Sequence, residues 1–193
     1  MGLFSFGKKK PTDTPTESGS PAPSGGATGG GFIAQPDKAR KFFDHARTIA
    51  ATGNLEYALM LYAKGFRFDP SSVEHHKLMY QCALQFISSG GKPAGRDQMK
   101  ELDGPSPIDK FALAEYVWMR DILNADNLFR LLEATAKASQ LDYAPFIAPK
   151  ALDVLRRQKK QSKAAWMKLK TLLAAIEAVA VGWVSVKLAE LGP

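Results

Sequence analysis

Residues 39–70 decide the fold class, and they read ARKFFDHARTIAATGNLEYALMLYAKGFRFDP. Apolar residues recur every three or four positions as far as Gly53-Asn54, and the same period resumes until Asp69-Pro70. This spacing gathers the apolar side chains on one face of a helix, and Gly-Asn and Asp-Pro are typical helix breakers. The stretch therefore predicts two antiparallel helices joined by a tight turn.

This hairpin resembles a tetratricopeptide repeat. In that family a small residue, here Ala58, lets the two helices approach closely, and an Asp-Pro pair ends the second helix. The resemblance implies an all-α fold, a tetratricopeptide-like α-solenoid of antiparallel hairpins, which holds a partner protein or peptide in a concave groove. The matching positions are Phe42, Ala46, Ile49, Gly53 to Ala58, Tyr62, Gly65, Phe66, Asp69 and Pro70.

Two later segments match the same pattern less closely. Residues 125–156 and 163–193 keep the apolar spacing, but Leu132 and Lys170 stand where a small residue is usual. A single helical pair cannot cover its own apolar face, so stacking about three or four pairs would bury one continuous core. We therefore expect one helical-repeat domain over residues 35–193.

The segments between these pairs carry helix signals of their own. A helix is expected after Ser71 and another after Ser106, because either serine can cap the backbone that follows it. Residues 88–106 are rich in Gly, Pro and charge, which predicts a long loop with one short helix near 97–102. Pro149 is expected to delay the start of the helix that contains it.

The N-terminal segment has a different composition. Residues 1–34 are rich in Pro, Ser, Thr and Gly, and they offer little apolar surface to offset the entropy lost on ordering. We expect a disordered tail that acts as a tether or a regulatory arm.

In a tetratricopeptide-like stack, a partner contacts the groove-facing side chains on the first helix of each pair. The pairs at 39–70, 125–156 and 163–193 give a mixed set of charged and apolar side chains at these positions. The predicted partner-binding residues are Arg40, Phe43, Asp44, Arg47, Phe129, Arg130, Glu133, Met167 and Lys168.

A basic stretch holds much of the positive charge of the chain. The net charge is +7, and no acidic residue lies between Asp153 and Glu177. Three interpretations stay open: a solvated connector, a patch for an anionic protein, or a contact for nucleic acid or lipid headgroups. The alternative function is thus a peripheral nucleic-acid or anionic-membrane-surface adaptor acting through residues 156–170. Nucleic acid is not the expected partner, because Trp166 is the only aromatic residue nearby. The basic patch comprises Arg156, Arg157, Lys159, Lys160 and Lys163.

The sequence shows no motif of an enzyme or of a metal site. His75 and His76 are neighbours, so on a helix they point about 100° apart and cannot chelate one ion. Cys82 is the only cysteine, and no Gly-rich segment has the spacing of a phosphate loop. We expect no catalysis, no cofactor and no metal, and a reducing, cytoplasmic location.

Residues 171–186 form the most hydrophobic run. A membrane-spanning helix needs about 20 apolar residues, whereas this run has sixteen and Glu177 interrupts it. We expect a pair of core helices here and no membrane span. An exposed apolar face at this end would let two copies associate through the C-terminal helices.

Overall fold

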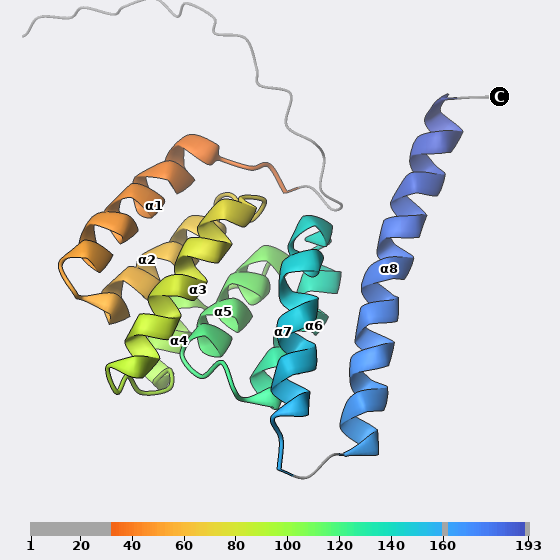
Figure 1. The fold of residues 1–193 in the computed structure, drawn as a ribbon. Coiled ribbons are helices and arrows are strands. Elements are labelled where there is room, and N and C mark those ends of the chain that lie inside the picture. Colours follow the sequence, from red (N-terminus) through yellow and green to blue (C-terminus); the bar gives the residue numbers. More distant parts are fainter. Residues whose placement is uncertain (1–31, 160–161, 192–193) are drawn as a thin grey trace, which may run out of the picture.

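The computed structural model describes residues 32–159 and 162–191, with side chains as far as Glu177 (Figure 1). Within these ranges the chain has eight α-helices, one 3-10 helix and no β-strand. The predicted all-α class is confirmed. The α-helices are α1 (Pro36–Ala51), α2 (Leu55–Phe66), α3 (Val73–Ser88), α4 (Arg96–Leu102), α5 (Pro107–Met119), α6 (Ala125–Lys137), α7 (Ala144–Arg156) and α8 (Lys163–Leu191), and the 3-10 helix is η1 (Leu141–Tyr143).

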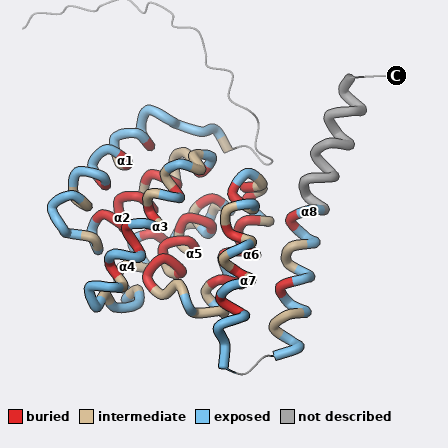
Figure 2. Tube along the Cα trace, in the orientation of Figure 1, coloured by how far each residue is buried: buried red, intermediate tan, exposed pale blue. Residues whose placement is uncertain are grey.

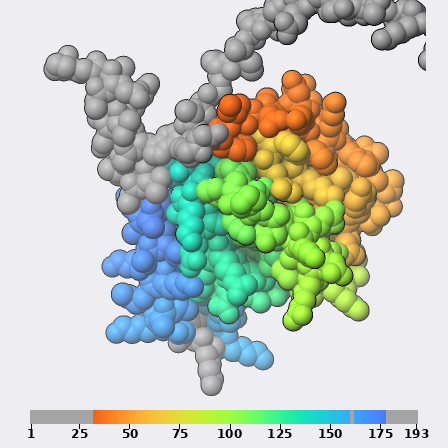
Figure 3. Space-filling view, turned by 180° about the vertical axis from the view of Figure 1, so that it is seen from behind, coloured from red at the N-terminus to blue at the C-terminus, as the bar shows by residue number. Residues whose placement is uncertain are grey.

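The helices follow one another across the molecule, from α1 at one edge to α8 at the other (Figures 1 and 3). α2 packs along α1 and also contacts α3 and α5, and α5 packs against α6. α6 in turn contacts α7 and α8. The helices are thus packed in pairs.

The first predicted hairpin is formed by α1 and α2. Gly53 takes a left-handed φ of 86° in the turn, and the Asn54 side chain accepts a backbone hydrogen bond at 3.3 Å. Ala58 is fully buried where α2 faces α1. Gly65 allows the same close approach, because a Cβ at this position would overlap the Phe43 ring.

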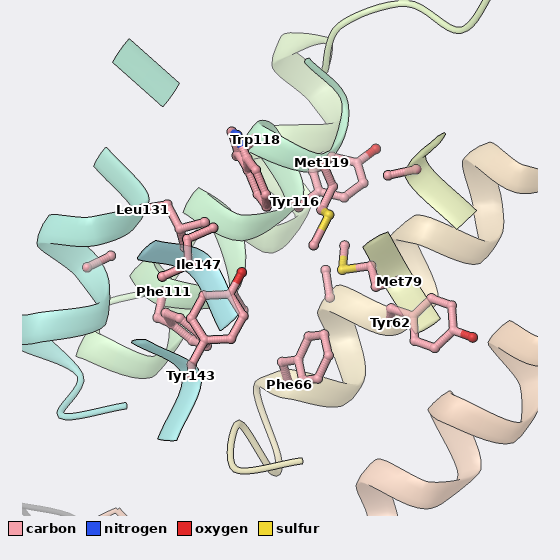
Figure 4. Close-up of a cluster of buried hydrophobic side chains, with 14 of the residues drawn as sticks. Tyr62, Phe66, Met79, Phe111, Tyr116, Trp118, Met119, Leu131, Tyr143 and Ile147 are labelled. Atoms are coloured by element: carbon pink, nitrogen blue, oxygen red, sulfur yellow. The ribbon is translucent and has the colours of Figure 1, made fainter. Parts of the chain in front are cut away.

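One apolar core joins the helical pairs (Figures 2 and 4). Figure 2 shows buried residues along α2, α5, α6 and α7, whereas most of α1 is exposed. Figure 4 shows large side chains from different helices converging on the interior. Those labelled are Tyr62, Phe66, Met79, Phe111, Tyr116, Trp118, Met119, Leu131, Tyr143 and Ile147.

Aromatic contacts attach α7 to α3. Tyr80 on α3 stacks on Trp118 of α5, with ring centroids 5.7 Å apart, and it meets Phe146 of α7 edge-on at 5.8 Å. The Lys150 ammonium lies 3.8 Å from the centroid of the Phe146 ring. α7 is therefore held by α3 as well as by α6.

The two predicted serine caps have different outcomes. The Ser106 hydroxyl accepts a hydrogen bond from the Asp109 backbone N–H at 3.0 Å, and the Asp109 carboxylate accepts one from the Ser106 N–H at 3.2 Å. This capping box confirms the predicted start of α5. The prediction for α3 is wrong by one residue: Ser72 is the N-cap, while the Ser71 hydroxyl donates to the Asp69 carboxylate at 2.6 Å.

Two expectations about the C-terminal helices are wrong. α7 begins at Ala144 with Pro145 in its first turn, and Pro149 lies inside the helix, where its side chain is exposed. Residues 163–191 form one continuous helix in place of a pair, because Gly182 alone does not break the run. In the described part of the chain, no helix has the length and apolarity needed to cross a membrane.

The predicted tail lies outside the described residues except at 32–34. Phe32 packs partly against the core, and the Gln35 backbone N–H donates to the Phe68 carbonyl at 2.8 Å. Phe32 thus contacts the folded domain, while the division between tail and domain at residue 34 stays a prediction.

Candidate functional site

The structure divides the predicted partner-binding residues between two parts of the surface. Arg40, Asp44 and Arg47 are exposed on α1, which packs along α2. The other predicted residues, apart from Phe43, lie on α6 and α8, toward the opposite edge of the molecule (Figure 1). The two sets are not neighbours, because α6 packs against α5, α7 and α8.

Phe43 is part of the core and does not face a groove. It is only 2% exposed, and its ring centroid lies 4.0 Å from that of His75 and 5.1 Å from that of Phe66. Its assignment as a partner contact is therefore corrected, because α2 and α3 already cover this ring.

Phe129 is also buried, with 4% of its surface exposed. The Lys168 ammonium covers its ring at 4.9 Å from the centroid and lies 3.5 Å from the Glu133 carboxylate. Lys168 thus holds α8 against α6, and Phe129 is not available to a partner. Met167, one residue earlier on α8, is 54% exposed.

Arg130 and Glu133 line an open depression of about 470 Å³ between α5 and α6. The loop before α5 contributes to it, so the site includes residues that the repeat pattern did not predict. Three cationic side chains and one carboxylate surround prolines and alanines. The lining residues are Pro105, Pro107, Lys110, Ala114, Arg130, Glu133, Ala134 and Lys137.

The basic patch lies at the junction of α7 and α8. Arg156, Arg157 and Lys159 are exposed where α7 ends, and Lys163 is exposed at the start of α8, whereas Lys160 lies outside the described residues. The patch is a solvated surface, and its binding role stays a prediction.

Comparison of the chain with protein-family models, with curated proteins and with solved structures finds no match. No family is assigned to it. The likeness of residues 39–70 to a tetratricopeptide repeat therefore depends on these residues and on the α1–α2 geometry alone.

A buried polar pair, which the sequence did not predict, joins α3 to α5. His76 and Glu115 are both fully buried. The His76 Nδ1 lies 2.7 and 2.9 Å from the two Glu115 oxygens, and Nε2 donates to the Pro70 carbonyl at 2.9 Å. Both ring nitrogens face acceptors, so one proton lies between the imidazole and the carboxylate. The neighbouring His75 is half-buried.

Tyr143 lies against this pair. Its ring centroid is 4.5 Å from that of His76, and its hydroxyl has no hydrogen-bond partner among the described residues. Burial, and then the nearby Glu115 carboxylate, raises the pKa of Tyr143 well above its ordinary value. The cluster is closed to solvent, so its role is to connect α3, α5 and η1.

Arg120 is another buried polar residue, and its side chain anchors the segment between α3 and α5, which contains α4. Its side chain donates to the Glu56 carboxylate at 2.9 Å and to the Lys92 carbonyl at 2.9 Å, and it lies 4.4 Å from the centroid of the Phe86 ring. Gln98 donates to Glu56 at 2.6 Å. This hydrogen bond and the charge of Arg120 lower the pKa of Glu56, outweighing the opposite effect of its partial burial.

Arg120→Met is expected to release this loop. Losing hydrogen bonds of this kind costs about 1.5–3 kcal/mol, which would raise the population of the open loop about tenfold or more. Trypsin cleavage after Arg96 and Lys100, measured at low protease concentration, reports this opening. Lys110→Ala removes only an exposed ion pair with Asp103 and should change cleavage less than about twofold. Equal cleavage of both variants would contradict the role of Arg120.

No group of three His, Cys, Asp or Glu side chains forms a metal site within the residues described. Cys82 is buried on α3, and burial raises the pKa of its thiol to about 11. The reactive thiolate is therefore disfavoured near neutral pH, which is the behaviour of a packing cysteine.

Proposed function

We propose that this chain is a non-catalytic scaffold whose tetratricopeptide-like helical pairs bind a partner protein or peptide. The observation that best supports this is the depression between α5 and α6. Arg130 and Glu133, both predicted from the repeat pattern as partner contacts, line it beside small apolar residues. A partly apolar floor with a charged rim is a common arrangement in protein-binding surfaces.

The solenoid is part of this proposal. α1 and α2 form its most regular unit, with Ala58 and Gly65 at the points of close approach. α3 and α5 form a second unit that the loop carrying α4 interrupts, and the buried pair of His76 and Glu115 joins its two helices. A cytoplasmic location fits a chain with a single cysteine.

The alternative is an adaptor for nucleic acid or for an anionic membrane surface. It is favoured by the shared exposure of Arg156, Arg157, Lys159 and Lys163 at one junction. Binding of this kind weakens steeply with salt, because it releases counterions.

Affinity capture with the full chain separates the two functions. Capture is carried out at low and high salt, with and without nuclease. A variant in which Arg156, Arg157, Lys159 and Lys160 are all glutamine is tested in parallel. The scaffold proposal predicts that, at low salt, the same protein is retained after nuclease treatment and by the glutamine variant. Loss of all captured material with nuclease, or with the glutamine variant, would contradict it and support the adaptor.

A further inference from the structure

Two cations at the α5–α6 depression have no acidic partner in the part of the chain that the structure describes. They are Arg130 and Lys137, both exposed on α6. The other charged side chains of the lining are paired, since Lys110 contacts Asp103 and Glu133 contacts a lysine of α8 at 3.5 Å. The depression therefore presents an excess of positive charge.

The spacing of these cations constrains what can bind. Arg130 and Lys137 are seven residues apart on α6, which places them on one face with about 10.5 Å of helix between them. A partner helix with acidic side chains seven positions apart has the same spacing. A groove between two helices commonly accepts a third helix in this way.

The floor of the depression is small and rigid. Pro105, Pro107, Ala114 and Ala134 line it, and none of them has a long side chain that would fill the space. An apolar side chain placed midway between the two acids of a partner would lie over this floor and lose contact with water.

We infer that the depression binds an acidic helical segment of a partner protein, with two carboxylates two turns apart on Arg130 and Lys137 and an apolar side chain between them. The inference rests on the proposed function and adds the chemistry of the partner. A nucleic acid would also bring negative charge, but the lining has no aromatic residue on which bases stack. Carboxylates with an apolar neighbour fit the surface better.

The test is fluorescence anisotropy of a labelled helical peptide titrated with the full chain. The peptide carries two glutamates seven positions apart and a leucine midway, in an alanine and glutamine background. A control peptide has glutamine in place of both glutamates. The wild-type chain is expected to bind the glutamate peptide, and R130E/K137E to weaken this binding by at least about tenfold.

Matched variants separate the groove from general charge and from misfolding. R130K/K137R keeps both charges and should bind within about threefold of wild type, and R156E/R157E reverses charge outside the depression and should stay within about twofold. A peptide with lysines in place of the glutamates should bind R130E/K137E more tightly than wild type, which an unfolded variant would not do.

Three results would overturn the inference: no binding of the glutamate peptide, equal binding of the glutamine peptide, or an equal loss with R156E/R157E. Binding of single-stranded oligothymidine that depends on Arg130 and Lys137 would overturn it in favour of nucleic acid. A protein captured equally well by R130E/K137E and wild type would also overturn it, yet would leave the proposed function standing. Failure to capture any protein would instead remove the proposed function.

Discussion

Glu115→Ala is expected to lower the free energy of unfolding by about 3–5 kcal/mol. The change leaves the His76 imidazole buried, with one ring nitrogen facing a space that no acceptor fills. It also removes the hydrogen bonds that the His76 imidazole shares with the Glu115 carboxylate between α3 and α5. A single domain is commonly stable by about 5–15 kcal/mol, so the variant would lose a large part of its stability.

Urea unfolding followed by circular dichroism measures this loss. His76→Leu and Glu115→Leu should each destabilise strongly, whereas the double variant should cost much less than their sum, because neither polar group is then left without its partner. Tyr143→Phe is the matched control: the hydroxyl that it removes lies near Glu115 but has no hydrogen bond of normal geometry, so the change should cost less than about 1 kcal/mol. A loss below about 1 kcal/mol for Glu115→Ala would show that the pair does not join the helices as described.

Phe43→Ala is expected to cost about 3–5 kcal/mol, the usual price of removing a buried aromatic side chain. The ring fills the space against Gly65 and packs on Phe66 and His75, so its loss opens a cavity where α1, α2 and α3 meet. The repeat pattern assigned the same side chain to a partner, which predicts a different result. If Phe43 only contacted a partner, Phe43→Ala would lower the affinity for that partner and leave the folded domain as stable as wild type.

Thermal and urea unfolding of the purified full chain decide between these roles. Arg47→Ala, one turn later on α1 and exposed, should change stability by no more than about 0.5 kcal/mol. Equal stability of Phe43→Ala and Arg47→Ala would mean that Phe43 is not part of the core.

The first hairpin was predictable because its signals are local. Gly53-Asn54, Ala58 and the apolar spacing act within 32 residues, and the structure places α1 and α2 accordingly. The adjacent Phe42 and Phe43 show the limit of this reasoning. Periodicity does not settle which of two neighbouring apolar residues faces the core, and that depends on where α2 and α3 pack. In the structure Phe43 is buried, while Phe42 stacks on Phe68 at 5.5 Å and stays partly exposed.

The buried pair was not predictable from local pattern, because its partners lie 39 residues apart. The available signal was Glu115 itself, a single acid inside the otherwise apolar end of α5. The candidate site was predictable only in part, because packing also brings together some of its residues from separate helices. Arg130 and Glu133 follow from the pattern of α6, whereas Pro105 and Lys110 join them only through the packing of α5 on α6.

The central claim is that the α5–α6 surface binds a protein and carries out no reaction. Site-specific photo-crosslinking tests it most directly, with a photoreactive amino acid at Ala114 in the lining of the depression, at Arg157 in the basic patch and at the exposed Thr48 on α1. The account predicts that Ala114 yields a discrete crosslinked protein and that Thr48 yields none. Crosslinks to nucleic acid at Arg157, with none to protein at Ala114, would contradict it.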